Sequence, residues 1–223
     1  MQTTPVIQQY LEIKASHQDS LLFFRMGDFY ELFFSDAEIA SAALNIILTK
    51  RGQHKGKDIP MCGVPFHSAE GYIKTLLDKN MKVAICEQLE TPKEAKKRGY
   101  KEIVKRDVVR IITPGTKLEE SFLVQKENNI LMALFFFDNS WASCWIDIST
   151  GLFKSTISNE SHLLSLIDQI SPKETISYAN KKELSILKSY IPIEVTWLES
   201  KKNFTRDILI DYLSSFFDPE RLQ

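Results

Sequence analysis

The chain has 223 residues, of which 43% are hydrophobic and 26% charged, a composition typical of one large or two small folded domains and not of a disordered protein. No apolar run is long enough to span a bilayer, and the N-terminal segment lacks the basic start and apolar middle of a signal peptide. Three widely spaced cysteines, Cys62, Cys86 and Cys144, argue against a disulfide framework and favour the cytoplasm.

The formal net charge is −1, but the charges are unevenly distributed. Residues 1–115 hold 17 of the 28 basic and 14 of the 29 acidic side chains, so this half is slightly positive and the remainder slightly negative. The asymmetry is small, and it indicates that an anionic partner would contact the first half.

The first half alternates predicted helices and strands. Pro5 after Thr4 predicts a helix start, because proline at the first helical position loses no hydrogen bond. An extended segment is predicted from Leu21 to Phe34, broken at Gly27 and Asp28. Ser35 and Glu38 then predict a capping box. The further expected elements are a basic loop at 49–58, a strand at 59–65, a helix capped by Ser68, a strand at 81–89, a charged excursion at 91–106 and a strand at 107–115.

The second half changes character near residue 116. Three apolar segments separated by turn residues predict an antiparallel meander of strands, which is followed by alternating helices and strands. This is the element order of ribonuclease-H-like folds. The ranges are strands at 129–137, 141–149 and 151–158, then helix 160–170, strand 174–179, helix 181–190, strand 193–199 and helix 205–217. The fold class is mixed α/β, with domains at 1–115 and 116–223.

The stretch FFRMGDFYELFF, residues 23–34, combines aromatic and charged side chains. Because side chains alternate along a strand, Phe29, Glu31 and Phe33 are expected on one face. An unpaired buried carboxylate costs several kcal/mol, so we expect this face to lie near solvent and to expose one or two phenylalanines. The alternative is that Glu31 pairs with a basic residue such as Arg25 while both phenyl rings pack inward.

One use of a phenyl ring beside a carboxylate is as a wedge between DNA base steps. Proteins that kink DNA insert apolar side chains between base steps, at an unstacking cost of roughly a few kcal/mol. A step beside an unpaired base is already loosened, so insertion there costs less. A carboxylate repels phosphates but can accept a hydrogen bond from a displaced base.

The sequence DFYE in this stretch resembles the Phe-x-Glu mismatch-reading motif of the bacterial MutS mismatch-repair family. The resemblance covers nearly all of residues 4–117 in an ordered series, and it is weaker in the second half, where NNILMAL and DISTG look like the family's connector domain. The matching segments are TPVIQQYLEIK, LTKRG, IPMCGVPFHSAEGYIKTLL, VAICEQ and VVRIITPGT.

The resemblance implies that Phe29 stacks on a mispaired base from the minor groove and that Glu31 hydrogen-bonds to that base. It places Met26 and Met61 where the recognition domain approaches the groove. It also implies sequence-independent phosphate contacts from four basic residues: Lys50, Arg51, Lys55 and Lys57. From the residues alone, that basic segment would be a solvated surface turn.

The resemblance further implies mismatched double-stranded DNA as the ligand, a MutL-type repair partner bound through the connector, and a homodimer in the full-length protein. No GxxxxGK[ST] loop occurs in the sequence, so the family's ATP or ADP and magnesium are expected in a missing C-terminal part. This chain is then an N-terminal piece that binds no cofactor or metal and catalyses nothing, which leaves open whether its second domain is complete.

Two other features admit different interpretations. Asp147 on a predicted strand could begin a nuclease metal site, but Glu174, Asp168 and Asp207 form no convincing partner set, which favours a turn carboxylate. The basic run from Lys93 to Arg106 is diluted by acidic residues, which favours a solvated surface over a nucleic-acid patch.

A third function class is a protein-docking module that uses Phe29 and Phe33. Cys62 and His67 lack a second ligand pair, so zinc is not expected.

Overall fold

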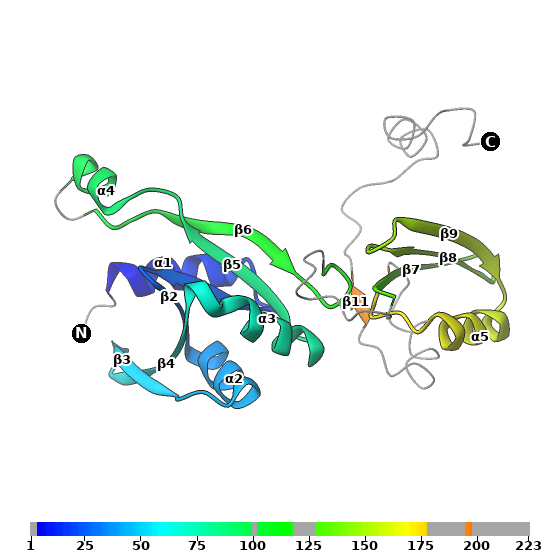
Figure 1. Ribbon diagram of the computed structural model, residues 1–223, viewed down its shortest axis with the longest axis horizontal. Helices are drawn as coiled ribbons and strands as arrows, with labels where there is room; N and C mark the ends of the chain where they lie inside the picture. The colour runs from blue at the N-terminus through cyan, green and yellow to red at the C-terminus, as the bar shows by residue number, and fades with distance from the viewer. Residues whose placement is uncertain (1–3, 100–101, 118–127, 178–194, 198–223) are drawn as a thin grey trace.

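The computed structural model describes residues 4–99, 102–117, 128–177 and 195–197, whose strands form two sheets (Figure 1). The elements of the first sheet and its helices are α1 (Pro5–Ala15), β1 (Ser20–Met26), β2 (Phe29–Phe33), α2 (Phe34–Leu44), β3 (Thr49–His54), β4 (Lys57–Pro65), η1 (Phe66–Ser68), α3 (Ala69–Asp78), β5 (Lys82–Gln88), α4 (Pro92–Arg98) and β6 (Arg106–Ile112). Those of the second are β7 (Ile130–Phe137), β8 (Ser140–Asp147), β9 (Leu152–Ser158), α5 (Glu160–Ile170), β10 (Glu174–Ser177) and β11 (Val195–Trp197).

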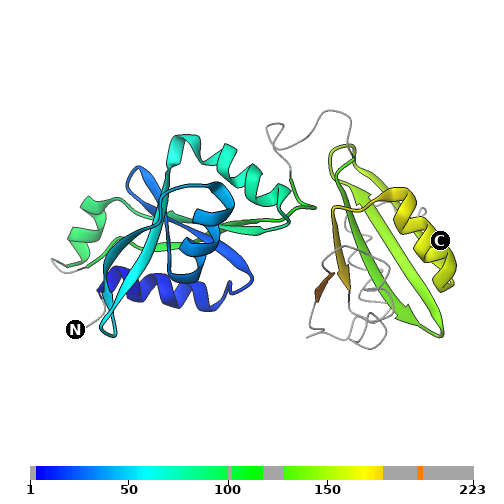
Figure 2. The same ribbon diagram turned by 90° about the horizontal axis from the view of Figure 1, so that it is seen from below.

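The first sheet has six strands in the order β3-β4-β2-β1-β5-β6. Only β1 and β5 pair in parallel, and the other neighbours are antiparallel. Helix α1 covers one face and α3 lies on the opposite side, with the sheet between them (Figure 2). We call these the α1 face and the α3 face. The mixed α/β class expected from the sequence is confirmed.

Each face of this sheet has its own apolar cluster, because successive strand residues point to opposite sides. On the α1 face, Leu22, Phe24 and Phe33 pack against Tyr10 of α1. On the α3 face, Leu21, Phe23, Tyr30 and Leu32 pack with residues of α2 and α3. The segment 23–34 therefore supplies core residues to both sides.

A buried carboxylate, Asp36, connects three elements of this domain. Its Oδ1 lies 2.9 Å from Lys14 Nζ of α1, and its Oδ2 accepts hydrogen bonds from the Tyr10 hydroxyl at 3.1 Å and the Leu22 amide at 3.0 Å. Burial and the Asp36 charge raise the pKa of Tyr10, so that its hydroxyl remains a donor. The negative charge of Asp36 is thus balanced by the Lys14 ammonium and by two hydrogen-bond donors.

The expected caps and loops differ from the structure in four places, one of which is Ser68: it precedes α3, but its side chain makes no capping hydrogen bond. Helix α2 begins at Phe34 and has no side-chain cap, so the capping box predicted from Ser35 and Glu38 is wrong. The expected basic loop at 49–58 forms most of the β3–β4 hairpin. The charged excursion contains α4, whose capping box is formed by Thr91 and Glu94.

The second sheet has the order β11-β10-β7-β8-β9. Strands β7, β8 and β9 form the predicted antiparallel meander, and β10 and β11 continue the sheet in parallel with β7. Leu163 and Ile167 of α5 pack on one face against a cluster that contains Met132 and Trp141. The helices predicted at 181–190 and 205–217 lie outside the described residues.

The two sheets meet at the turn that follows β6. The Gly115 amide donates to Glu174 Oε2 at 3.1 Å, and Asn129 Nδ2 donates to the Lys117 carbonyl at 3.1 Å. Lys117 Nζ in turn lies 2.6 Å from Asp78 Oδ1 at the end of α3. A Cβ atom at Gly115 would lie 2.7 Å from Glu174 Cβ, so this close approach requires glycine.

None of the helices in the described ranges has the length and apolar character needed to cross a membrane.

Candidate nucleic-acid interface

The tight turn between β1 and β2 places Phe29 at the tip of a hairpin. Gly27 adopts φ +61°, a conformation that glycine takes without strain, and Phe29 lies opposite Met26 of β1 and Pro65 of β4. The Asp28 carbonyl accepts a hydrogen bond from the Phe66 amide at 2.9 Å, which fixes the turn to the end of β4. The Phe29 side chain is 48% exposed.

Burial falls steadily along the α1 face of β2. Phe33 is completely buried beneath Tyr10, with ring centroids 5.0 Å apart, whereas Glu31 is partly buried and Phe29 is exposed. The expected shared face of these three residues is correct. The alternative in which both phenyl rings pack inward is wrong for Phe29, and a docking surface made of both rings is wrong for Phe33.

Glu31 is paired with Arg51, whose guanidinium contacts both carboxylate oxygens. Arg51 lies in β3, and the intervening strand β4 has Gly63 directly opposite Glu31. Burial raises the pKa of Glu31 above its ordinary value, although the charges of Arg51 and Arg106 act in the opposite direction. The negative charge of Glu31 is therefore balanced by the guanidinium of Arg51.

Arg25, the partner expected for Glu31, is on the α3 face instead. Its guanidinium lies 3.3 Å from the centre of the Phe66 ring and 3.8 Å from Glu87 Oε1. Residues 25 and 31 are on adjacent strands, but alternation sends their side chains to opposite sides of the sheet. This part of the sequence-based alternative is wrong.

The remaining predicted residues lie on the same face or on the β3–β4 hairpin. Met26 is partly buried next to Phe29, while Met61 is partly buried opposite Phe33, farther toward the core. Lys50 Nζ lies 2.7 Å from Asp58 Oδ2, and both side chains are exposed. The hydrogen bond with Asp58 raises the pKa of Lys50. Lys55 and Lys57 are exposed at and beside the hairpin turn.

Residues 4–121 match the family model described as MutS domain I, which covers more than half of the chain. The chain belongs to the MutS family. It is 53% identical to the DNA mismatch repair protein MutS of Wolbachia pipientis wMel over 191 residues, which are 84% of this chain and 22% of that protein. It is 55% identical to MutS of Rhizobium meliloti over 177 residues, 78% of this chain and 19% of that protein. The chain thus spans about a fifth of the length of these relatives.

Within this MutS domain I, sequence reasoning missed the role of Gly63 and the pairing of Arg51 with Glu31. An isolated glycine inside a predicted strand is typical of a close approach, and this was the available signal. Arg106, expected only as part of the basic run, reaches back to the α1 face. Its guanidinium lies 5.0 Å from the Phe24 ring centre and donates to the Arg25 carbonyl at 2.7 Å.

Asp147 is the turn carboxylate that the sequence favoured. Burial alone would raise its pKa, but hydrogen bonds from the Ser149 hydroxyl at 2.6 Å and the Ser149 amide at 3.0 Å lower it overall. In the described ranges, no group of three or more His, Cys, Asp or Glu side chains could hold a metal ion. The Glu174 carboxylate accepts a hydrogen bond from the Gly115 amide, Asp168 is exposed on α5, and Asp207 lies outside the described residues.

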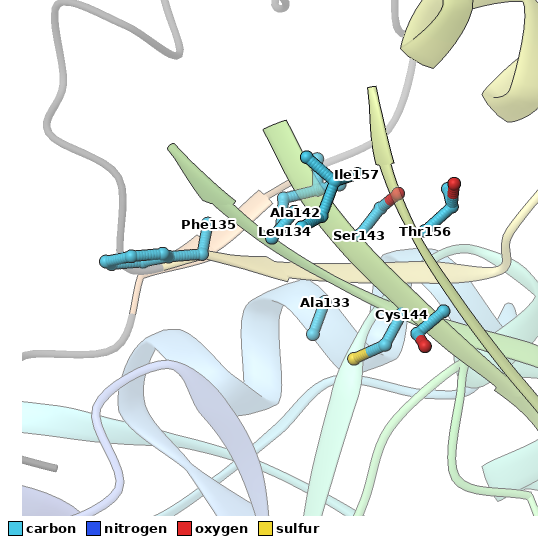
Figure 3. A pocket seen from close by; sticks show the side chains of 9 residues that line it. Ala133, Leu134, Phe135, Ala142, Ser143, Cys144, Thr156 and Ile157 are labelled. Atoms are coloured by element: carbon cyan, nitrogen blue, oxygen red, sulfur yellow. The ribbon is translucent and has the colours of Figure 1, made fainter. Parts of the chain in front are cut away.

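The other candidate chemical groups are structural. Burial raises the pKa of the Cys62 thiol to about 11 and that of Cys86 to about 12, as expected for core cysteines. A shallow apolar depression of about 300 Å³ on the second sheet contains Ala133, Phe135, Cys144 and Ile157 (Figure 3). The residues that line this depression include no charged side chain, and its polar groups are the hydroxyls of Ser143, Ser155 and Thr156 and the Cys144 thiol.

Proposed function

We propose that residues 1–115 recognise mispaired or unpaired bases in duplex DNA, as the mismatch-sensing part of a longer DNA mismatch-repair protein. The supporting observation is the contrast on one strand face: Phe33 is core, while Phe29, two residues away, projects from the hairpin tip. An exposed phenyl ring with a carboxylate beside it is available for insertion into a loosened base step, whereas a buried ring such as Phe33 is not.

The proposed mechanism separates affinity from discrimination. The exposed cations of the β3–β4 hairpin, Lys50, Lys55 and Lys57, supply phosphate contacts that are independent of sequence and sensitive to salt. Phe29 enters the minor groove beside Met26, with Met61 supporting the surface behind it, and tests how easily a step opens. Glu31 then forms a hydrogen bond with the displaced base.

For residues 116–223 we propose a ribonuclease-H-like connector without catalytic activity. The meander followed by two parallel strands supports this assignment, because it follows the element order of that fold. In the full-length protein, we expect the connector to bind a MutL-type partner and the protein to dimerise. We also expect ATP hydrolysis, with its magnesium, to take place outside these 223 residues, in the cytoplasm.

A binding experiment tests this function. Full-length protein is titrated against a duplex with a one-base bulge and against the matched duplex, at several salt concentrations. We expect tighter binding to the bulge at every salt concentration, and a shared decrease as salt rises. Equal affinity for the two duplexes would exclude mismatch recognition, and magnesium-dependent cleavage that Asp147→Asn removes would support the nuclease alternative.

A further inference from the structure

The β3–β4 hairpin contains an irregularity at the residue that holds Glu31. Lys50 pairs with Pro60 and Gln53 pairs with Asp58, so Arg51 and Gly52 together face the single residue Ile59. This is a β-bulge, and Gly52 has the positive φ of +69° that glycine tolerates. Bulges bend a strand and change the direction of its side chains, and Arg51 here reaches inward over the α1 face.

Arg51 and Glu31 lie on the two sides of β4 and are offset along it, because Arg51 faces Ile59 whereas Glu31 faces Gly63. Strands that are second neighbours lie roughly 10 Å apart, so both long side chains must extend over β4 to meet. A Cβ atom at Gly63 would lie 3.7 Å from Glu31 Cγ and 3.3 Å from the Tyr30 carbonyl oxygen. A side chain at position 63 would therefore crowd the Glu31 side chain.

The two partners differ in solvent exposure. The Glu31 side chain is 13% exposed and that of Arg51 is 45% exposed, so the carboxylate lies deeper than the guanidinium that covers it. Both contacts are made by a single nitrogen, Arg51 Nη1, which holds the carboxylate close to the guanidinium through its two oxygens. An ionised carboxylate offers about four acceptor positions, so this pairing leaves some of them for a base edge.

We propose that Arg51 is a positioning residue for mismatch discrimination, which holds the Glu31 carboxylate beside Phe29 and is neutralised by it instead of contacting a DNA phosphate. This inference rests on the proposed roles of Phe29 and Glu31. It separates Arg51 from Lys50, Lys55 and Lys57, with which the sequence grouped it. Toward a matched duplex the Glu31–Arg51 pair has no net charge. Toward a displaced base it presents an oriented carboxylate oxygen that accepts a hydrogen bond.

The decisive experiment uses the slope of log affinity against log salt in full-length protein. Each phosphate contact contributes about 0.9 to this slope on duplex DNA. The double variant Glu31→Ala/Arg51→Ala removes a neutral pair, so we expect the wild-type slope together with a preference for the bulge that is lowered about tenfold, the loss expected for one charge-assisted hydrogen bond. Glu31→Ala alone frees Arg51 for a phosphate, and its slope should be steeper by up to about 0.9.

A double variant whose slope is shallower than wild type by about 0.9 would overturn the proposal, because it would show that Arg51 is a phosphate contact. The matched control is Lys57→Ala on the same hairpin, which should lose about 0.9 of slope and keep the preference for the bulge. Wild-type protein that does not prefer the bulge would refute the proposed function instead, so the two failures are distinguishable.

A second measurement tests the pair in the 223-residue chain without DNA. Arg51 from β3 and Arg106 from β6 are the charged groups that act on Glu31. Carbon-13 NMR of the Glu31 carboxyl group should give a higher pKa in Arg51→Gln than in wild type, because the nearer cation is lost. An unchanged pKa would contradict the proposed pairing.

Discussion

Phe29 and Phe33 occupy the same face of β2, and their different burial gives the two rings different roles. Strand alternation was enough to predict the shared face, because it follows from backbone geometry alone. How far α1 covers this face of β2 could not be predicted from the sequence of β2, because it depends on where Tyr10 packs. The identity of the Glu31 partner was missed for a similar reason: Arg51 is distant in sequence and reaches Glu31 from β3, over the intervening strand β4.

Replacing Phe29 separates recognition from stability. Phe29→Ala in the full-length protein should abolish the preference for a bulge while lowering stability by only about 1 kcal/mol, because the ring is half exposed. Phe33→Ala, on the same face and completely buried, should cost about 3–5 kcal/mol. Thermal unfolding and duplex binding measure the two effects.

The control for DNA binding is Phe135→Ala, which removes a ring of similar exposure, 50%, from the second sheet. It should leave the preference for the bulge unchanged. A large fall in melting temperature for Phe29→Ala would mean that this ring is part of the core and would refute its assigned role.

Replacing Glu31 should affect the two duplexes differently. Glu31→Ala should lower affinity for the bulge and leave or raise affinity for matched DNA, because a negative charge near the phosphates is removed. Fluorescence anisotropy with both duplexes measures the change. Equal losses on both would show that Glu31 supports the fold and not discrimination.

At the scale of elements, the β3–β4 hairpin shows the limit of pattern reasoning. β3 is an edge strand whose residues are all exposed or partly exposed, so no apolar alternation marks it and it was expected to be a loop. Its charged residues, Lys50 and Arg51, are typical of edge strands that avoid pairing with another chain. Buried strands such as β5 were predictable because their apolar residues are continuous.

Asp36 provides a stability prediction at this scale. Asp36→Ala would remove the acceptor of the Leu22 amide and the carboxylate partner of Lys14 and Tyr10, which would keep only their hydrogen bonds to backbone carbonyls, at a cost of about 3 kcal/mol in the free energy of unfolding. Tyr10→Phe removes only one donor and should cost about 1 kcal/mol. Urea unfolding measures both, and similar small losses would show that the network contributes little.

At the scale of the whole molecule, the described part of the chain forms two sheets with separate cores, joined at the Gly115 turn. The change of pattern near residue 116 was visible in the sequence because a mixed helix–strand order gives way to a meander. The contact between Glu174 and Gly115 was not, since the two residues are far apart in sequence and nothing local relates them. Glu174 was considered only as a metal ligand, whereas it accepts a backbone hydrogen bond.

Gly115→Ala tests the joint between the sheets. The new methyl group would lie 2.7 Å from Glu174 Cβ, so we expect a loss of about 1–3 kcal/mol and faster hydrogen exchange at residues 113–117 and 174–177. The matched control is Gly71→Ala in α3, where nothing lies within 4 Å of the added atom and the substitution should stabilise the helix by roughly 0.5–1 kcal/mol. Unchanged exchange at both segments would show that the sheets are not coupled at this turn.

Photo-crosslinking from position 29 tests directly whether Phe29 reaches an unpaired base. A photoreactive phenylalanine analogue replaces Phe29 in the full-length protein, which is irradiated with a one-base-bulge duplex and with the matched duplex. We expect a crosslink to the unpaired base or its immediate neighbour in the first duplex, and little in the second. Equal crosslinking to both duplexes, or crosslinks spread along the DNA without regard to the bulge, would contradict it.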